Sequence, residues 1–188
     1  FDVTRVNPNP ARFDPKKAEA INGVWLRRLP TDELARRMVP FLQSAGVLPP
    51  SPSADELKVL RAAAPLVQER MSVLEEAIDM LGFLFTDDNV LSPDSDALTA
   101  IQAPEARAAV AATRDALAEL PDWTADSIEA ALRSALVEGL GLKPKHAFGP
   151  VRLAVTGRRV SPPLFESLAL LGRERTLARL DTALALAR

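Results

Sequence analysis

The side chains best suited to binding chemistry are concentrated in residues 150–180, which read PVRLAVTGRRVSPPLFESLALLGRERTLARL. Three arginines are expected on one loop there: Arg152, Arg158 and Arg159. A guanidinium is planar and charged, so it can contact phosphates or base edges through two parallel hydrogen bonds. The break Ser161-Pro162-Pro163 follows, and it fits a helix N-terminus with Ser161 as the cap. Because a helix N-terminus also attracts anions, both features favour a negatively charged ligand.

Other arginines have two interpretations each. Arg70 lies in LVQERMSVL, near the end of a helix predicted over residues 53–70, where the negative end of the helix dipole favours any cation. Two pairs could contact phosphates or simply solvate their helices: Arg27 with Arg28, and Arg36 with Arg37. Three more are expected to be solvated surface residues: Arg173, Arg175 and Arg179.

The net charge of −2 conceals a strong segregation of charge along the chain. Residues 1–70 carry 11 basic and 8 acidic side chains, and residues 71–139 carry 3 basic and 14 acidic ones. Residues 140–188 carry 9 basic and 3 acidic side chains. A polyanion would therefore be attracted by both ends and repelled by the middle, as in a nucleic-acid binder that docks with defined polarity.

The sequence predicts neither catalytic residues nor a metal site. His146 is the single histidine, and a histidine on a loop or half-buried is expected rather than a ligand or a general base. The chain has no cysteine, which excludes disulfides and thiolate ligands. Four aspartates, which do not match the spacing of an EF-hand, are expected to cap helices: Asp87, Asp88, Asp94 and Asp96.

Composition and capping signals predict an all-α protein. Aromatic residues make up only 5% of the chain, and Leu and Ala supply most of its apolar content. Helix N-caps are expected at four residues: Asp14, Thr31, Ser53 and Thr124. No apolar run approaches the roughly 20 residues that span a bilayer. We expect two helical subdomains, residues 1–82 and 83–188.

Both tryptophans are expected to be core or staple residues rather than platforms on which bases stack. Ile21, Trp25 and Leu29 recur on one face of the first predicted helix. Trp123 and Ile128 have the spacing of a hydrophobic staple around the Thr124 cap.

Two segments carry a family resemblance. PVRLAVTG, the proline-containing turn and the LLGRERTLARL run at 150–180 resemble the C-terminal end of bacterial glutamyl-tRNA synthetases. FDPKKAEAINGVWLRRL at 13–29 is similar to the segment where the tRNA-binding half of that family begins. The two matches occur in the family's order and together cover essentially the whole chain.

The resemblance implies roles for particular residues. Arg70 corresponds to an arginine that reads the last anticodon base, and Arg152 to one that contacts the anticodon region. The family's turn packs against anticodon bases, which implies contacts from Ser161, Pro162 and Leu164. Arg158 and Arg159 would contact tRNA phosphates.

The resemblance also implies a longer parent enzyme, glutamate–tRNA ligase, that uses ATP and Mg²⁺. The catalytic HIGH-like and KMSKR-like motifs of class I synthetases do not occur here, and the first residue is Phe1. We therefore expect a C-terminal tRNA-binding region with no cofactor of its own and no activity alone. Expected partners are tRNA-Glu, with tRNA-Gln left open, and the parent's catalytic domain. A monomer in the cytoplasm, away from membranes, is expected. The alternative is a stand-alone helical module that binds proteins.

Overall fold

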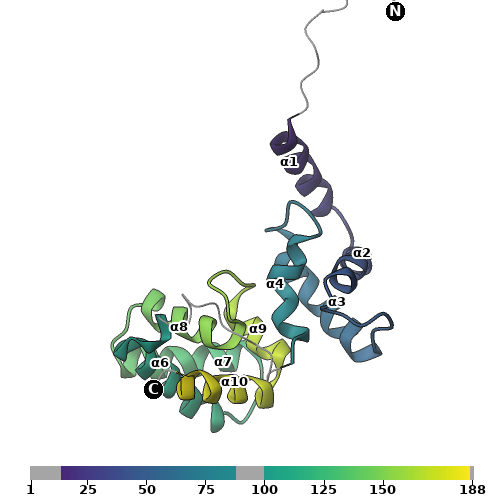
Figure 1. Ribbon diagram of the computed structural model, residues 1–188. Coiled ribbons are helices and arrows are strands. Elements are labelled where there is room, and N and C mark those ends of the chain that lie inside the picture. The colour runs from purple at the N-terminus through teal and green to yellow at the C-terminus, as the bar shows by residue number, and fades with distance from the viewer. Residues whose placement is uncertain (1–13, 88–99, 187–188) are drawn as a thin grey trace, which may run out of the picture.

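The computed structural model describes residues 14–87 and 100–186, all of whose regular elements are helices, which confirms the all-α prediction. Figure 1 shows two groups of helices, the first lobe and the second lobe. The first lobe contains α1 (Pro15–Leu26), α2 (Thr31–Ser44), α3 (Ala54–Gln68) and α4 (Glu76–Phe85). The second lobe contains α6 (Pro104–Ala118), α7 (Ala125–Leu132), the π-helix η2 (Arg133–Gly139), α8 (Pro144–Thr156), α9 (Leu164–Leu171) and α10 (Arg173–Leu186). No described helix is both long and apolar enough to span a membrane.

Capping chemistry sets the start of α1 and α3. The Asp14 carboxylate accepts a hydrogen bond from the Lys17 backbone N–H at 3.2 Å, and Pro15 occupies the first helical position. Ser53 and Glu56 form a complete capping box, with reciprocal hydrogen bonds of 3.2 and 2.7 Å. Each bond satisfies a backbone donor that the helix itself leaves free, so the predicted caps are confirmed.

α2 begins differently from the prediction. Thr31 is its first helical residue rather than its cap, and the flanking Pro30 makes no side-chain cap. The fixed φ of Pro30, with ψ at 146°, already places the chain in the extended geometry of an N-cap. Leu34, Met38 and Leu42 recur on one face of α2 and are buried, whereas Phe41 is 37% exposed.

α1 projects from the first lobe and exposes the face that was predicted to be buried (Figure 1). Ile21 is 51% exposed and Trp25 is 61% exposed, so the predicted burial of this face is wrong. The opposite side holds the helix to the lobe, where Asn22 donates to the Ser72 carbonyl at 2.6 Å and Gly23 is buried. The helical period alone could not show which side of α1 would meet the rest of the chain.

The second lobe is built around α6, which packs against α8 and α10, while α7 packs against α9. Thr124 caps α7 by accepting from the Ser127 N–H at 3.2 Å, as predicted. Trp123 is half-buried, and its indole N–H donates to the Leu168 carbonyl at 3.0 Å, which confirms a packing role. The guanidinium of Arg173 lies 5.4 Å from the Trp123 ring centre and strengthens this corner.

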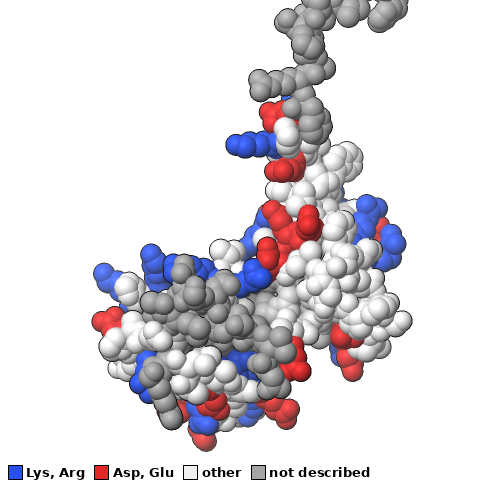
Figure 2. Space-filling view, viewed as in Figure 1, with Lys and Arg blue, Asp and Glu red and all other residues white. Residues whose placement is uncertain are grey.

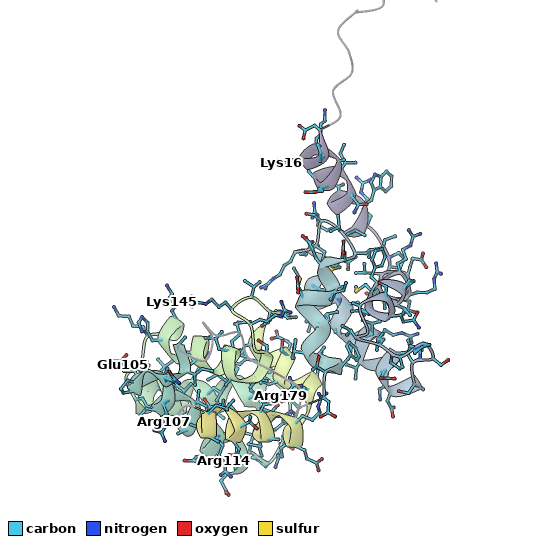
Figure 3. All side chains as sticks on the ribbon, viewed as in Figure 1. Lys16, Glu105, Arg107, Arg114, Lys145 and Arg179 are labelled. Atoms are coloured by element: carbon cyan, nitrogen blue, oxygen red, sulfur yellow. The ribbon has the colours of Figure 1, made fainter. Side chains whose placement is uncertain are left out.

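Arg175 and Arg179 of α10 donate hydrogen bonds from the second lobe to carbonyl oxygens at the end of α4 in the first. Figure 3 labels Arg179 on α10. Arg175 donates to the carbonyl oxygens of Leu84 and Thr86, and Arg179 is only 2% exposed. The prediction that Arg173, Arg175 and Arg179 are solvated surface residues is therefore wrong. A buried guanidinium is tolerated because carbonyl oxygens replace its water.

The predicted subdomain boundary after residue 82 falls inside α4, which packs against α2 and α3. Three of the four aspartates that were expected to cap helices lie outside the described residues: Asp88, Asp94 and Asp96. The division into two subdomains stays a prediction.

Candidate nucleic-acid interface

Arg152 lies on a helix rather than on the predicted loop. α8 begins with Pro144 in its first turn and ends at Thr156, where Gly157 has a φ of 71°. Only glycine adopts this left-handed conformation readily, so the helix ends there and not before Arg152. Arg152 is thus held one turn from the end of α8.

The Arg152 guanidinium organises the turn between α8 and α9. It donates to the Pro162 carbonyl at 2.7 Å, to the Ser161 carbonyl at 3.4 Å and to the Ser161 hydroxyl. Ser161 and Pro162 are both buried, so these bonds fix the backbone of the turn from the interior of the protein. Arg152 therefore organises this turn, and it does so through carbonyl and hydroxyl oxygens rather than through a carboxylate.

Arg70 reaches the same turn from the first lobe. It follows the end of α3, and its guanidinium donates to the Ser161 carbonyl at 2.9 Å. Arg70 and Arg152 therefore meet at this turn, since a single carbonyl oxygen accepts from both. The two side chains come from opposite sides of the lobe junction, and Arg70 is 91 residues from Ser161.

The Arg70–Arg152 pair carries two positive charges without a neutralising carboxylate among the described residues. Burial lowers the pKa of Arg152, and the nearby charge of Arg70 lowers it further. Like charges so close are unfavourable unless an anion or water compensates them. The arrangement therefore offers a favourable place for a negatively charged or acceptor-rich ligand.

The turn itself differs from the prediction in which side chains it exposes. Pro163 is the N-cap of α9, and the Ser161 hydroxyl bonds to the Pro162 carbonyl at 3.0 Å instead of capping the helix. Leu164 is only 4% exposed, so the prediction that it presents an apolar contact at the surface is wrong for this arrangement. Val160 is 67% exposed and takes that place. Its position directly before the predicted break was the signal that the sequence analysis missed.

Arg158 and Arg159 are exposed on the same turn. The Thr156 hydroxyl lies 3.1 Å from the Arg158 carbonyl and 3.2 Å from its N–H, and so holds the backbone here. Arg158 also forms an ion pair with Asp79 of α4 at 2.7 Å, a partner that nothing in the sequence indicated. An exposed pair of this kind is weak, so Arg158 can exchange Asp79 for a phosphate at low cost.

Figure 2 shows Lys and Arg side chains along the rim of the second lobe that faces α1. The exposed basic residues of α8 and its flanking turns are Lys143, Lys145, Arg158 and Arg159. Acidic side chains of the first lobe meet the inner end of this basic rim (Figure 2). A polyanion would therefore follow the rim and the turn rather than the acidic part of the first lobe.

The described residues contain no cluster of three or more metal-ligating side chains. His146 lies in the first turn of α8 and is exposed rather than half-buried. The site described above consists of hydrogen-bond donors and positive charge, which suits binding and positioning rather than bond making.

Comparisons with known proteins agree with one another. The profile of the anticodon binding domain family matches residues 33–184. The chain is 59% identical over 182 residues to the glutamate–tRNA ligase of Kineococcus radiotolerans, and 52% identical over 184 residues to that of Saccharopolyspora erythraea. These matches cover 96% and 98% of the chain, but only 36% of each relative.

A solved structure shows the same fold. The crystal structure of a glutamate tRNA ligase from Elizabethkingia meningosepticum, in complex with its amino acid, matches with a TM-score of 0.77 at 23% identity. The match covers 100% of this chain and 36% of that one. The chain thus spans about a third of the length of the proteins it resembles.

Proposed function

Because the chain belongs to the anticodon-binding domain family and corresponds to the C-terminal region of glutamate–tRNA ligases, we propose that it binds tRNA at the anticodon. The observation that carries the proposal is the convergence of Arg70 and Arg152 on the Ser161 carbonyl. Unpaired anticodon bases expose acceptor edges, and guanidinium groups read such edges through directional hydrogen bonds.

We assign two kinds of contact to the site. Arg70 and Arg152 would read bases, since their remaining donors are held in fixed positions beside a buried turn. Ser161 and Pro162 would shape that surface from within, Leu164 would support it, and exposed Arg158 and Arg159 would contact phosphates. Base contacts specify and phosphate contacts position the nucleic acid.

The whole enzyme would activate glutamate with ATP and Mg²⁺ and attach it to tRNA-Glu during translation in the cytoplasm. That chemistry would belong to the part of the relatives that this chain does not match. The chain would act as a monomer, contribute tRNA selection, and use remote binding energy to orient the acceptor end. Charging of tRNA-Gln remains an alternative that the test below addresses.

The alternative function, a helical module that binds proteins, calls for an exposed apolar patch and for no basic surface shared by the two end segments. Arg70 belongs to the first basic segment and Arg152 to the last, yet their guanidinium groups share one acceptor. This contact argues against the alternative.

The test compares Arg70→Gln with Arg158→Ala on tRNAs that differ only in the third anticodon base. Arg70→Gln should cost about 1–3 kcal/mol of binding and relax the preference at that base. Arg158→Ala should weaken both tRNAs equally and reduce the salt slope by about one unit. Arg114→Ala is the control, because Arg114 pairs with Asp181 inside the second lobe.

Equal weakening of both tRNAs by Arg70→Gln would show that Arg70 is a backbone contact or a structural residue. Binding that no variant changes would contradict the proposed site altogether.

A further inference from the structure

Arg179 satisfies the C-terminal ends of two helices that belong to different lobes. Its Nη1 donates to the Val155 carbonyl at 2.8 Å, in the last turn of α8. Its Nη2 donates to the Phe83 carbonyl at 2.8 Å and to the Thr86 carbonyl at 3.1 Å, at the end of α4. Carbonyl oxygens in a last helical turn have no partner within the helix and carry the negative end of its dipole. One buried cation therefore stabilises both helix ends at once.

Arg175 reinforces the same contact one turn earlier on α10. It donates to the Leu84 carbonyl at 2.6 Å and to the Thr86 carbonyl at 2.5 Å. The Thr86 oxygen thus accepts from both arginines, as the Ser161 oxygen accepts from Arg70 and Arg152. We call Arg175, Arg179 and the carbonyls they bind the junction clamp.

The helices held by the clamp are those that carry the candidate site. α8 bears Arg152 three residues before Val155 and leads directly into the Ser161 turn. α4 packs against α3, and Arg70 follows the end of α3. A change in the angle between the lobes would therefore alter the distance from the Arg70 guanidinium to the Ser161 carbonyl.

We propose that Arg175 and Arg179 are positioning residues for tRNA recognition, because they fix the two lobes so that Arg70 and Arg152 face one ligand. This inference rests on the proposed function, although the fixing of the lobes can be tested without tRNA. The clamp does not contact the ligand, and it acts by setting the geometry of the residues that do.

The first measurement is a distance between the lobes. The chain has no cysteine, so Lys58→Cys on α3 and Arg107→Cys on α6 introduce two exposed attachment points for spin labels. Double electron–electron resonance should give one narrow distance distribution in the otherwise unchanged chain. We expect Arg175→Ala and Arg179→Gln to broaden or shift it, because each removes bonds across the junction. Arg114→Ala is the matched control, since it removes an arginine contact to α10 within the second lobe.

The second measurement is the preference between tRNAs that differ only in the third anticodon base. Arg175→Ala should reduce this preference by roughly two- to thirty-fold, the range found for residues that act through coupling. The salt slope should not change, because a residue that acts only by positioning the lobes makes no phosphate contact of its own. A purely structural role would lower stability without changing the preference of the molecules that remain folded.

An unchanged distance distribution in a folded Arg175→Ala protein would overturn the proposal, and so would equal broadening by Arg114→Ala. If Arg179→Gln fails to fold, Arg175→Ala decides the question alone. Unchanged preference despite a broadened distribution would also overturn it. Absence of any base preference in the parent chain would instead refute the proposed function, while the distance measurement would still report on the clamp.

Discussion

Arginines meet backbone carbonyls on two sides of the lobe junction, and the two sides differ in what they leave exposed. Around Thr86, Arg175 and Arg179 use their donors on helix ends, and Arg179 is buried. Around Ser161, Arg152 is half-buried and Arg70 lies at the surface. The same chemistry therefore stabilises the fold where the protein encloses the guanidinium, and it leaves donors available for the ligand binding proposed above where the guanidinium still faces solvent.

The largest effect should be a loss of folding stability when an arginine of the enclosed group around Thr86 is replaced. Arg179→Ala leaves the carbonyls of Val155, Phe83 and Thr86 without this donor and opens a cavity. Hydrogen bonds to charged groups contribute about 1.5–3 kcal/mol each, so we expect the free energy of unfolding to fall by about 3 kcal/mol or more. Urea denaturation followed by circular dichroism measures it. Arg114→Ala should cost far less, and equal losses would remove the distinction between the two sides.

On the exposed side, around Ser161, a substitution should reduce tRNA binding more than it reduces the stability of the fold. Arg152→Gln should weaken tRNA binding by about 1–3 kcal/mol. It should lower the free energy of unfolding by only about 1 kcal/mol, because the glutamine amide can still donate to Ser161 or Pro162. Filter binding and urea denaturation on the same protein give both values. A stability loss as large as that of Arg179→Ala, with tRNA binding intact, would place Arg152 among the architectural arginines.

A smaller effect is expected at the exposed apolar side chain of the turn. Val160→Ala removes about two buried methylene equivalents if a base packs on Val160, which corresponds to at most ~1.6 kcal/mol of tRNA binding. Stability should not change, because Val160 is 67% exposed in the free protein. Leu164→Ala should behave in the reverse way, since Leu164 is buried. Loss of tRNA binding from Leu164→Ala without loss of stability would contradict this assignment.

The smallest effect concerns Arg36 and Arg37, which share one carboxylate partner, Glu33. Hydrogen bonds from Arg36 and Arg37 lower the pKa of Glu33 to about 2. A carboxyl whose pKa is lower in the folded than in the unfolded protein stabilises the fold at pH values above its unfolded pKa. That stability is lost as the pH falls towards and through the folded pKa. The loss should therefore occur between about pH 4.5 and 2. Carboxyl NMR titration should show the low pKa, and it should rise in Arg36→Ala. An ordinary pKa in the unaltered chain would contradict the pairing.

Helix caps between neighbouring residues could be predicted from the sequence, whereas hydrogen bonds between residues far apart in the chain could not. The capping box of Ser53 and Glu56 and the Thr124 cap depend on residues three apart, so the pattern contains all their information. The burial of Arg179 depends on carbonyls 24 to 96 residues away, and nothing near Arg179 indicates them.

The candidate site shows the same limit at finer scale. The segregation of charge indicated that the two basic ends of the chain share a surface, and the resemblance singled out Arg70 and Arg152 within them. The helical period could not have paired residues from opposite lobes. The helix after the turn begins at Leu164, later than the predicted start at the prolines. Because α9 begins later than predicted, Leu164 is buried and Val160 is exposed. The sequence had instead pointed to Leu164 as the apolar side chain that contacts the ligand.

The contacts that join the lobes are also among the most distant in sequence. Arg70 to Ser161 spans 91 residues, and Arg179 to Phe83 spans 96. Closing long loops costs chain entropy before any contact is gained, so helices within each lobe should form first. During synthesis α1–α4 emerge before α10 exists, and the end of α4 must wait for its arginines. We therefore expect the tRNA-binding geometry to be the last feature to assemble as the protein folds.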